Sequence, residues 1–144
     1  MQNEPRIAII TTRYYEDFMT RYLDAVQAAL VECQVAREAQ AVFTVPGAVE
    51  IPLMAQHCAR KQCFDAIITL GLVIRGETDH YQYVCEQASQ GCQQVMLNAH
   101  IPVIFGVFTV HHIAQAEARL DGTKCFIAQE LAQAAMEMCH LLAQ

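Results

Sequence analysis

The sequence has little positive charge and no segment in which basic residues gather. Nine Lys and Arg stand against 15 Asp and Glu, which leaves a formal net charge of −6 over 144 residues. Because clusters of Lys and Arg neutralise the phosphates of a nucleic acid, this composition argues against nucleic acid as a partner. Any anion that the protein binds is expected to be small and held locally.

Long apolar runs are also missing. The longest apolar stretches, 66–74 and 101–110, are shorter than the roughly 18 residues that a membrane-spanning helix needs. The first residues, Met-Gln-Asn-Glu-Pro-Arg, have neither the basic nor the apolar region of a secretory signal. We therefore expect a cytoplasmic protein with no membrane partner.

Spacings typical of metal ligands are absent as well. The seven cysteines form no C-x-x-C pair, and in a reducing compartment most of them are expected to be small buried hydrophobic residues. The adjacent His111 and His112 cannot both ligate one ion, because neighbouring residues point to different faces of a helix. The sequence supports no metal site.

The composition that remains is that of a globular protein. Hydrophobic residues make up 54% of the chain and charged residues 17%. A chain of this length buries roughly 70% of its unfolded surface, so disorder is excluded over most of it. We expect one domain over residues 1–144, without a linker or an internal repeat.

Segments of two periodicities alternate along the chain. Short apolar runs predict strands, and apolar residues three or four positions apart predict the helices between them. The predicted strands are 6–12, 41–45, 64–73 and 102–109, and the predicted helices are about 16–33, 49–61, a long helix after Gly76, 111–119 and 128–142. Such an order implies right-handed crossovers and a three-layer α/β/α sandwich with a four-stranded parallel sheet.

Ligands of such sheets bind where the strands end at their carboxyl side. We expect four stretches to meet at that edge: 12–15, 45–50, 74–80 and 105–112. Two aromatic rings among them, from Tyr14 or Tyr15 and from Phe105, could sandwich a flat heterocycle, although aromatic residues at strand ends often only close a core.

The turn 75–80 joins the central strand to the long helix and has two interpretations. Its backbone N–H groups, with Gly76 and the Thr78 hydroxyl, could form a pocket for an anion. Alternatively, Asp79 and Gln82 form a capping box, or Thr78 caps the helix.

Three further residues are candidates for chemistry. His80 lies in the first helical turn, where the helix dipole favours the neutral imidazole that a general base requires. Glu50 is an acid among apolar residues, suited to hydrogen bonding with ligand hydroxyls. Arg119 is isolated and could hold a phosphate. Each of these residues can also be interpreted more simply as an ordinary polar or surface residue.

Four motifs together resemble the 6,7-dimethyl-8-ribityllumazine synthase family. They are 45–52 (VPGAVEIP), 65–71 (DAIITLG), 73–78 (VIRGET) followed by His80, and 102–107 (PVIFGV). Their order and spacing cover nearly the whole chain. The resemblance implies a flavodoxin-like fold and the penultimate step of riboflavin synthesis. That step condenses 5-amino-6-(D-ribitylamino)uracil with 3,4-dihydroxy-2-butanone 4-phosphate, releases phosphate and water, and needs no cofactor.

The resemblance also assigns roles to individual residues. The implied catalytic residue is His80, which transfers protons. The implied contacts with ribitylaminouracil are Tyr14, Ala48, Val49, Glu50, Val73, Ile74 and Phe105, and those with phosphate are Glu77, Thr78 and Arg119. Lys124 and Glu130 match a lysine and an acid of the family by alignment only.

Members of this family are homo-oligomers in which neighbouring subunits share each active site. The resemblance implies that Phe105 and Arg119 of this chain would be supplied to the site by the neighbouring subunit. A pentamer or a pair of pentamers is therefore expected. This chain departs from the family pattern at Tyr14-Tyr15, where Phe-Asn is usual, and in the segment after Arg119. A non-catalytic lumazine- or flavin-binding protein of the same fold is the alternative, and an interaction protein with a flavodoxin-like fold is a third possibility.

Overall fold

The computed structural model describes residues 4–144, so the first three residues of the expected domain lie outside it. Four parallel strands form one sheet in the order β2-β1-β3-β4. Their bounds are β1 Ile7–Thr12, β2 Gln40–Val45, β3 Ala66–Ile74 and β4 Val103–Val110. Each predicted strand is present within two residues of its predicted ends.

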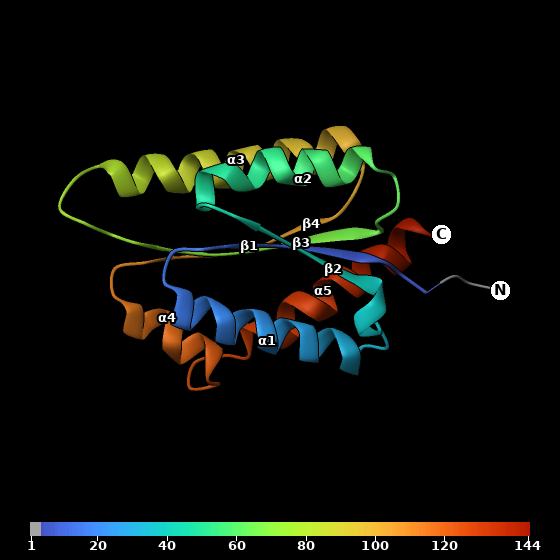
Figure 1. Cartoon of the computed structure of the whole chain (residues 1–144), viewed down its shortest axis with the longest axis horizontal. Helices are drawn as coiled ribbons and strands as arrows, with labels where there is room; N and C mark the ends of the chain where they lie inside the picture. The colour runs from blue at the N-terminus through green and yellow to red at the C-terminus, as the bar shows by residue number, and fades with distance from the viewer. Residues whose placement is uncertain (1–3) are drawn as a thin grey trace.

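Helices cover both faces of this sheet, as Figure 1 shows. One layer consists of α2 (Ile51–Arg60) and α3 (His80–Ala99), and the other of α1 (Glu16–Glu32), α4 (Ile113–Leu120) and α5 (Ile127–Leu142). The predicted three-layer sandwich with a four-stranded parallel sheet is therefore confirmed. No helix among residues 4–144 is long and apolar enough to cross a membrane.

Two helices begin later than their sequence pattern predicts. Residues Ala48–Glu50 form a 3₁₀ turn, and α2 follows from Ile51 with a proline in its first turn, where a missing N–H costs nothing. Helix α4 begins at Ile113 because the Gln115 side chain accepts the backbone N–H groups of His111 and His112, at 2.7 and 3.2 Å.

The strands are buried because both faces of the sheet are covered. Ile7 and Ile9 face the layer of α1, α4 and α5, whereas Ala8 and Ile10 face α2 and α3. This arrangement explains why apolar residues occupy consecutive positions of β1 rather than alternate ones.

Strand β3 extends beyond its neighbour β1 at the carboxyl end. Thr12 of β1 pairs with Val45 of β2, while β3 continues to Ile74, which pairs with Val110 of β4. The loops that follow β1, β2 and β3 consequently surround a step in the sheet edge.

Candidate active site

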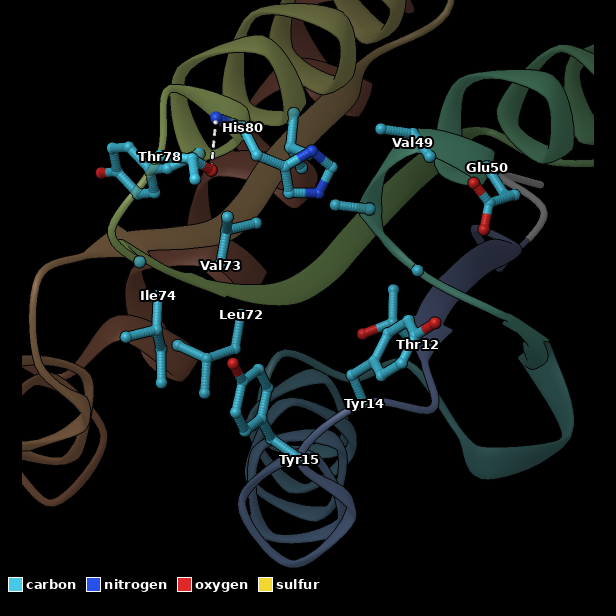
Figure 2. Close-up of a pocket in the computed structure, with 15 residues that line it drawn as sticks. Thr12, Tyr14, Tyr15, Val49, Glu50, Leu72, Val73, Ile74, Thr78 and His80 are labelled. Atoms are coloured by element: carbon cyan, nitrogen blue, oxygen red, sulfur yellow. Dashed lines mark hydrogen bonds between the residues drawn. The ribbon is translucent and has the colours of Figure 1, made fainter.

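A cavity of about 390 Å³ lies at this step, and we call it the edge cavity. Residues from the carboxyl ends of β1, β2 and β3 and from the start of α3 line it (Figure 2). They are Thr12, Tyr14, Tyr15, Gly47, Ala48, Val49, Glu50, Leu72, Val73, Ile74, Gly76, Thr78, His80, Tyr81 and Val84. Three of the four stretches expected at the sheet edge therefore meet in one chain.

Tyr14 offers an aromatic surface to the edge cavity. Its side chain is 66% exposed, and its ring lies directly over Gly47. A Cβ atom at position 47 would lie 3.0 Å from Tyr14 Cε2, a tight contact that would require the ring to shift by a few tenths of an ångström. The glycine of the Pro-Gly turn thus provides the space in which the Tyr14 ring sits.

The residues predicted to contact the heterocycle and its side chain lie at two walls of the edge cavity. Val73 and Ile74 at the end of β3 are half-buried. Ala48, Val49 and Glu50 come from the 3₁₀ turn after β2, and the half-buried Glu50 carboxylate is available to hydroxyl donors. Figure 2 places Val49 and Glu50 together on one side of the edge cavity.

The turn before α3 is organised by Thr78, which is drawn with its hydrogen bond to His80 in Figure 2. The Thr78 Oγ1 atom accepts the backbone N–H of His80 at 3.3 Å. Its own hydroxyl hydrogen is therefore free to point at a ligand. Of the two capping alternatives, the box of Asp79 and Gln82 is wrong, since the Asp79 side chain makes no capping hydrogen bond. The other is supported, since Thr78 accepts the first N–H of α3.

His80 is the first residue of α3, and its exposed imidazole projects from the helix end over the edge cavity. Tyr14 and Val73 line the same hollow. The arrangement brings a proton-transfer group, an aromatic surface and a helix N-terminus together around one space.

Phe105 and Arg119 lie outside the edge cavity of their own chain. Phe105 pairs with Thr69 in the middle of the sheet, not at its carboxyl end, so its predicted face-to-face position with Tyr14 or Tyr15 in one chain is wrong. The Arg119 guanidinium on α4 instead donates a hydrogen bond of 2.7 Å to the backbone oxygen of Gln115.

Three other predicted residues do not line the edge cavity either. Glu77 is exposed in the turn before α3. Lys124 is exposed in the connection between α4 and α5, and Glu130 borders a separate shallow hollow with Cys125 and Phe126. Within one chain, the phosphate-binding set is therefore divided between the edge cavity and the opposite helical layer.

Several residues that line the edge cavity were not among the predicted site residues. They are Thr12, Gly47, Leu72, Tyr81 and Val84. Tyr15 and Gly76 also line it, as was expected of a stacking ring and of an anion pocket. Val84 follows His80 by one helical turn, so helical spacing was a usable signal for it. Leu72 gave no such signal, because the direction of its side chain depends on the sheet twist.

Tyr81 also connects the turn before α3 with the end of β4. Its ring meets the ring of His111 edge-on, with centroids 6.2 Å apart. Burial raises the pKa of the neighbouring Cys85 thiol, which is half-buried on α3. Cys85 therefore stays protonated at neutral pH and is unsuited to act as a nucleophile. No group of three His, Cys, Asp or Glu in residues 4–144 is placed to hold a metal ion.

Known proteins resemble this chain along nearly its whole length. The sequence profile described as 6,7-dimethyl-8-ribityllumazine synthase matches residues 4–143. The 6,7-dimethyl-8-ribityllumazine synthases of three Coxiella burnetii strains, Dugway 5J108-111, CbuG_Q212 and RSA 493 / Nine Mile phase I, are each 42% identical to it over 137 residues. The aligned segment covers 95% of this chain and 91% of each relative, so the similarity extends across sheet, helices and edge cavity.

Proposed function

The chain belongs to the 6,7-dimethyl-8-ribityllumazine synthase family and is an enzyme of riboflavin biosynthesis, and we propose that its reaction takes place in the edge cavity. The reaction condenses 5-amino-6-(D-ribitylamino)uracil with 3,4-dihydroxy-2-butanone 4-phosphate and releases phosphate and water. The observation that carries the proposal is the meeting of Tyr14, Glu50, Thr78 and His80 in one cavity, from three separate chain reversals.

The first substrate fits the side of the edge cavity formed by Tyr14 and the 3₁₀ turn. The flat pyrimidine stacks on the exposed Tyr14 ring, against Val73 and Ile74. The ribityl chain extends along Ala48 and Val49, where its hydroxyls donate hydrogen bonds to the Glu50 carboxylate. These contacts orient the amine that attacks the ketone.

The phosphate of the second substrate is placed at the turn before α3. The free hydroxyl hydrogen of Thr78 and the N-terminus of the 20-residue helix α3 both favour an anion there. His80, beside them, moves protons while water leaves as the Schiff base forms and while phosphate is eliminated. Glu77 lies in the same turn.

The remaining proposed contacts come from a second copy of the chain. Phe105 is 37% exposed on the edge strand β4, and Arg119 lies in the opposite helical layer, so a neighbour can present both at the edge cavity. A groove of about 850 Å³ between α2 and α3 provides a seat for that neighbour. Val49 lines both this α2–α3 groove and the edge cavity, so a copy bound in the groove would reach the site.

We place the assembly as a pentamer or a pair of pentamers, as the family membership favours. Leu53, which is 74% exposed in the α2–α3 groove, is expected to be buried by the neighbour. Leu53→Asp should reduce the assembled fraction in analytical ultracentrifugation. An assembly unchanged by this substitution would place the interface elsewhere.

The proposed reaction is tested by mixing both substrates with the purified protein and following lumazine fluorescence. His80→Ala should lower kcat by about 100-fold while the pyrimidine still binds. His140→Ala is the matched control, because His140 lies exposed at the end of α5, away from the edge cavity. Absence of turnover in the unchanged protein, with a bound yellow ligand, would instead indicate a binding protein.

Sharing of the site between subunits is tested by mixing two impaired variants. His80→Ala and Arg119→Ala subunits, each with strongly reduced turnover alone, are unfolded together and reassembled. If His80 and Arg119 of one site come from different chains, about a quarter of the sites in a randomly mixed ring regain both residues. No recovery of turnover would mean that both residues act within one chain.

A further inference from the structure

Tyr15 has a left-handed backbone conformation that is not explained by the C-terminal end of a helix. Four residues other than glycine have positive φ angles in the described chain: Tyr15 at 59°, Gln34 at 72°, Gln62 at 55° and His100 at 54°. The last three lie at or just after the C-terminal ends of α1, α2 and α3, where a left-handed residue commonly ends a helix. Tyr15 instead precedes α1.

This conformation is unfavourable for a bulky side chain, and no local bond explains it. Left-handed backbone is tolerated by Gly and Asn but is strained for an aromatic residue. Tyr15 occupies the N-cap position of α1, yet it makes no side-chain capping hydrogen bond. Strain of this kind tends to collect at ligand-binding sites, where the geometry it produces is used.

The geometric result is that two consecutive tyrosines line the same cavity. In an extended chain, Tyr14 and Tyr15 would point to opposite sides. Here both line the edge cavity, and Tyr15 is 45% exposed. Figure 2 shows the Tyr15 ring beside Leu72 and Ile74, whereas Glu50 lies on the far side of Tyr14.

From this placement we propose that Tyr15 is a specificity-determining residue that contacts 3,4-dihydroxy-2-butanone 4-phosphate. The inference rests on the proposed function, which puts the ribityl chain at Glu50 and phosphate at Thr78. Ile74, which borders the pyrimidine, also leads directly into the turn that carries Thr78. We therefore place the second substrate between the pyrimidine and that turn, on the side of the edge cavity where Tyr15 lies. The phenol O–H is a donor for its hydroxyl or phosphate oxygens, and the ring covers its carbon chain.

The test measures KM for each substrate separately in two variants. Tyr15→Phe removes only the hydroxyl and should raise KM for the butanone phosphate about 3- to 10-fold, the effect of one lost hydrogen bond. Tyr15→Asn also removes the ring and should raise it further. KM for the ribitylaminouracil should stay within about 2-fold in both, since the Tyr14 surface is unchanged.

A stability measurement separates binding from damage to the fold. Because Asn tolerates the left-handed conformation, Tyr15→Asn should raise Tm by about 2–4 °C while it weakens substrate binding. A merely structural role would move both KM values together or lower Tm. Tyr83→Phe is the matched control, since Tyr83 is exposed on α3 and does not line the edge cavity.

The possible results have distinct meanings. An unchanged KM for the butanone phosphate in both variants, or an equal rise for both substrates, overturns the role of Tyr15. Lack of turnover in the unchanged protein overturns the proposed function itself, before any variant is compared.

Discussion

The two faces of the sheet differ in how completely this chain covers them. On the side of α1, α4 and α5, the rings of Phe18, Tyr22 and Phe108 pack with centroids 5.0 to 5.8 Å apart. The buried Tyr22 hydroxyl donates a hydrogen bond of 2.7 Å to the backbone oxygen of Gly106. This face is closed by large side chains and by a satisfied polar group.

The face beneath α2 and α3 has a smaller core and a more open exterior. Its fully buried residues are aliphatic residues, alanines and cysteines, and the rings of Phe43 and Phe64 pack against them only half-buried. The α2–α3 groove lies on its outside, bordered by glutamines of both helices and by the exposed Leu53. The edge cavity opens beside this layer. The comparison teaches that one face is closed by large packed side chains, whereas the other is the face beside which we propose that substrate and neighbouring chains bind.

The largest expected effect is that of an added methyl group on the closed face. At Gly106, a Cβ atom would lie 2.6 Å from the backbone oxygen of Thr69 and 2.8 Å from the Tyr22 hydroxyl. Gly106→Ala should lower the free energy of unfolding by about 3 kcal/mol in urea denaturation, because backbone on one side prevents relaxation. Gly76→Ala is the control, since a Cβ there meets nothing within 4 Å. Equal losses for the two variants would contradict the assignment of a rigid closed face.

A smaller loss of stability is expected when the buried Tyr22 hydroxyl on this face is removed. Tyr22→Phe removes the donor to the Gly106 oxygen and should cost about 1–2 kcal/mol of unfolding free energy. Burial raises the pKa of Tyr22, so the folded state disfavours the phenolate. The parent protein should therefore lose stability as pH rises above the ordinary tyrosine pKa of about 10, and Tyr22→Phe should lose less over that range. Urea midpoints at neutral and alkaline pH measure both effects.

A methyl group added on the face beneath α2 and α3 should change the free energy of unfolding less. A Cβ at Gly91 of α3 would lie 2.6 Å from Cγ of Pro52 on α2, so the two helices must move apart. In the dissociated subunit the α2–α3 groove leaves them room outward, and alanine gains about 1 kcal/mol of helix propensity over glycine. Gly91→Ala should therefore change the free energy of unfolding by less than about 1 kcal/mol. A loss as large as that of Gly106→Ala would mean that both layers are equally rigid.

The smallest effect is expected at the exposed connection between α4 and α5. Hydrogen bonds from Thr123, including its backbone N–H at 2.8 Å, hold the pKa of Asp121 below its ordinary value. The stability from this carboxylate is complete above the ordinary pKa of about 4 and is lost as pH falls through the lower folded value. Asp121→Asn should slightly reduce the loss of stability that occurs as the pH falls below about 4. Parallel acid titrations of the two proteins, followed by circular dichroism, compare those losses.

The sequence predicted the layers well because local patterns report them. The run 64–73 is apolar at nearly every position, which only a strand covered on both faces explains, and β3 is the long central strand. The aromatic Tyr14, the acid Glu50 and His80 were also predicted on local grounds. All three follow a strand end and line the edge cavity.

Other features depended on contacts between distant segments. Phe105 was expected at the sheet edge, but the pairing of β4 with β3 places it opposite Thr69. The start of α4 is set by the reach of the Gln115 side chain, and the Asp79 carboxylate leaves the helix cap unused. Strand register and side-chain conformation depend on contacts between elements that are distant in the sequence. They cannot therefore be predicted from local periodicity.

By itself, the amino-acid order determined which segments are strands and helices, that the sheet is parallel, and which polar residues follow its strands. Those properties arise from short-range periodicity and from the need to bury apolar faces. Only the tertiary structure decided that Tyr14 and Tyr15 line one cavity and that Phe105 and Arg119 stay outside it. A side chain's direction depends on backbone bends and strand register, which are selected by the free energy of the whole packed chain.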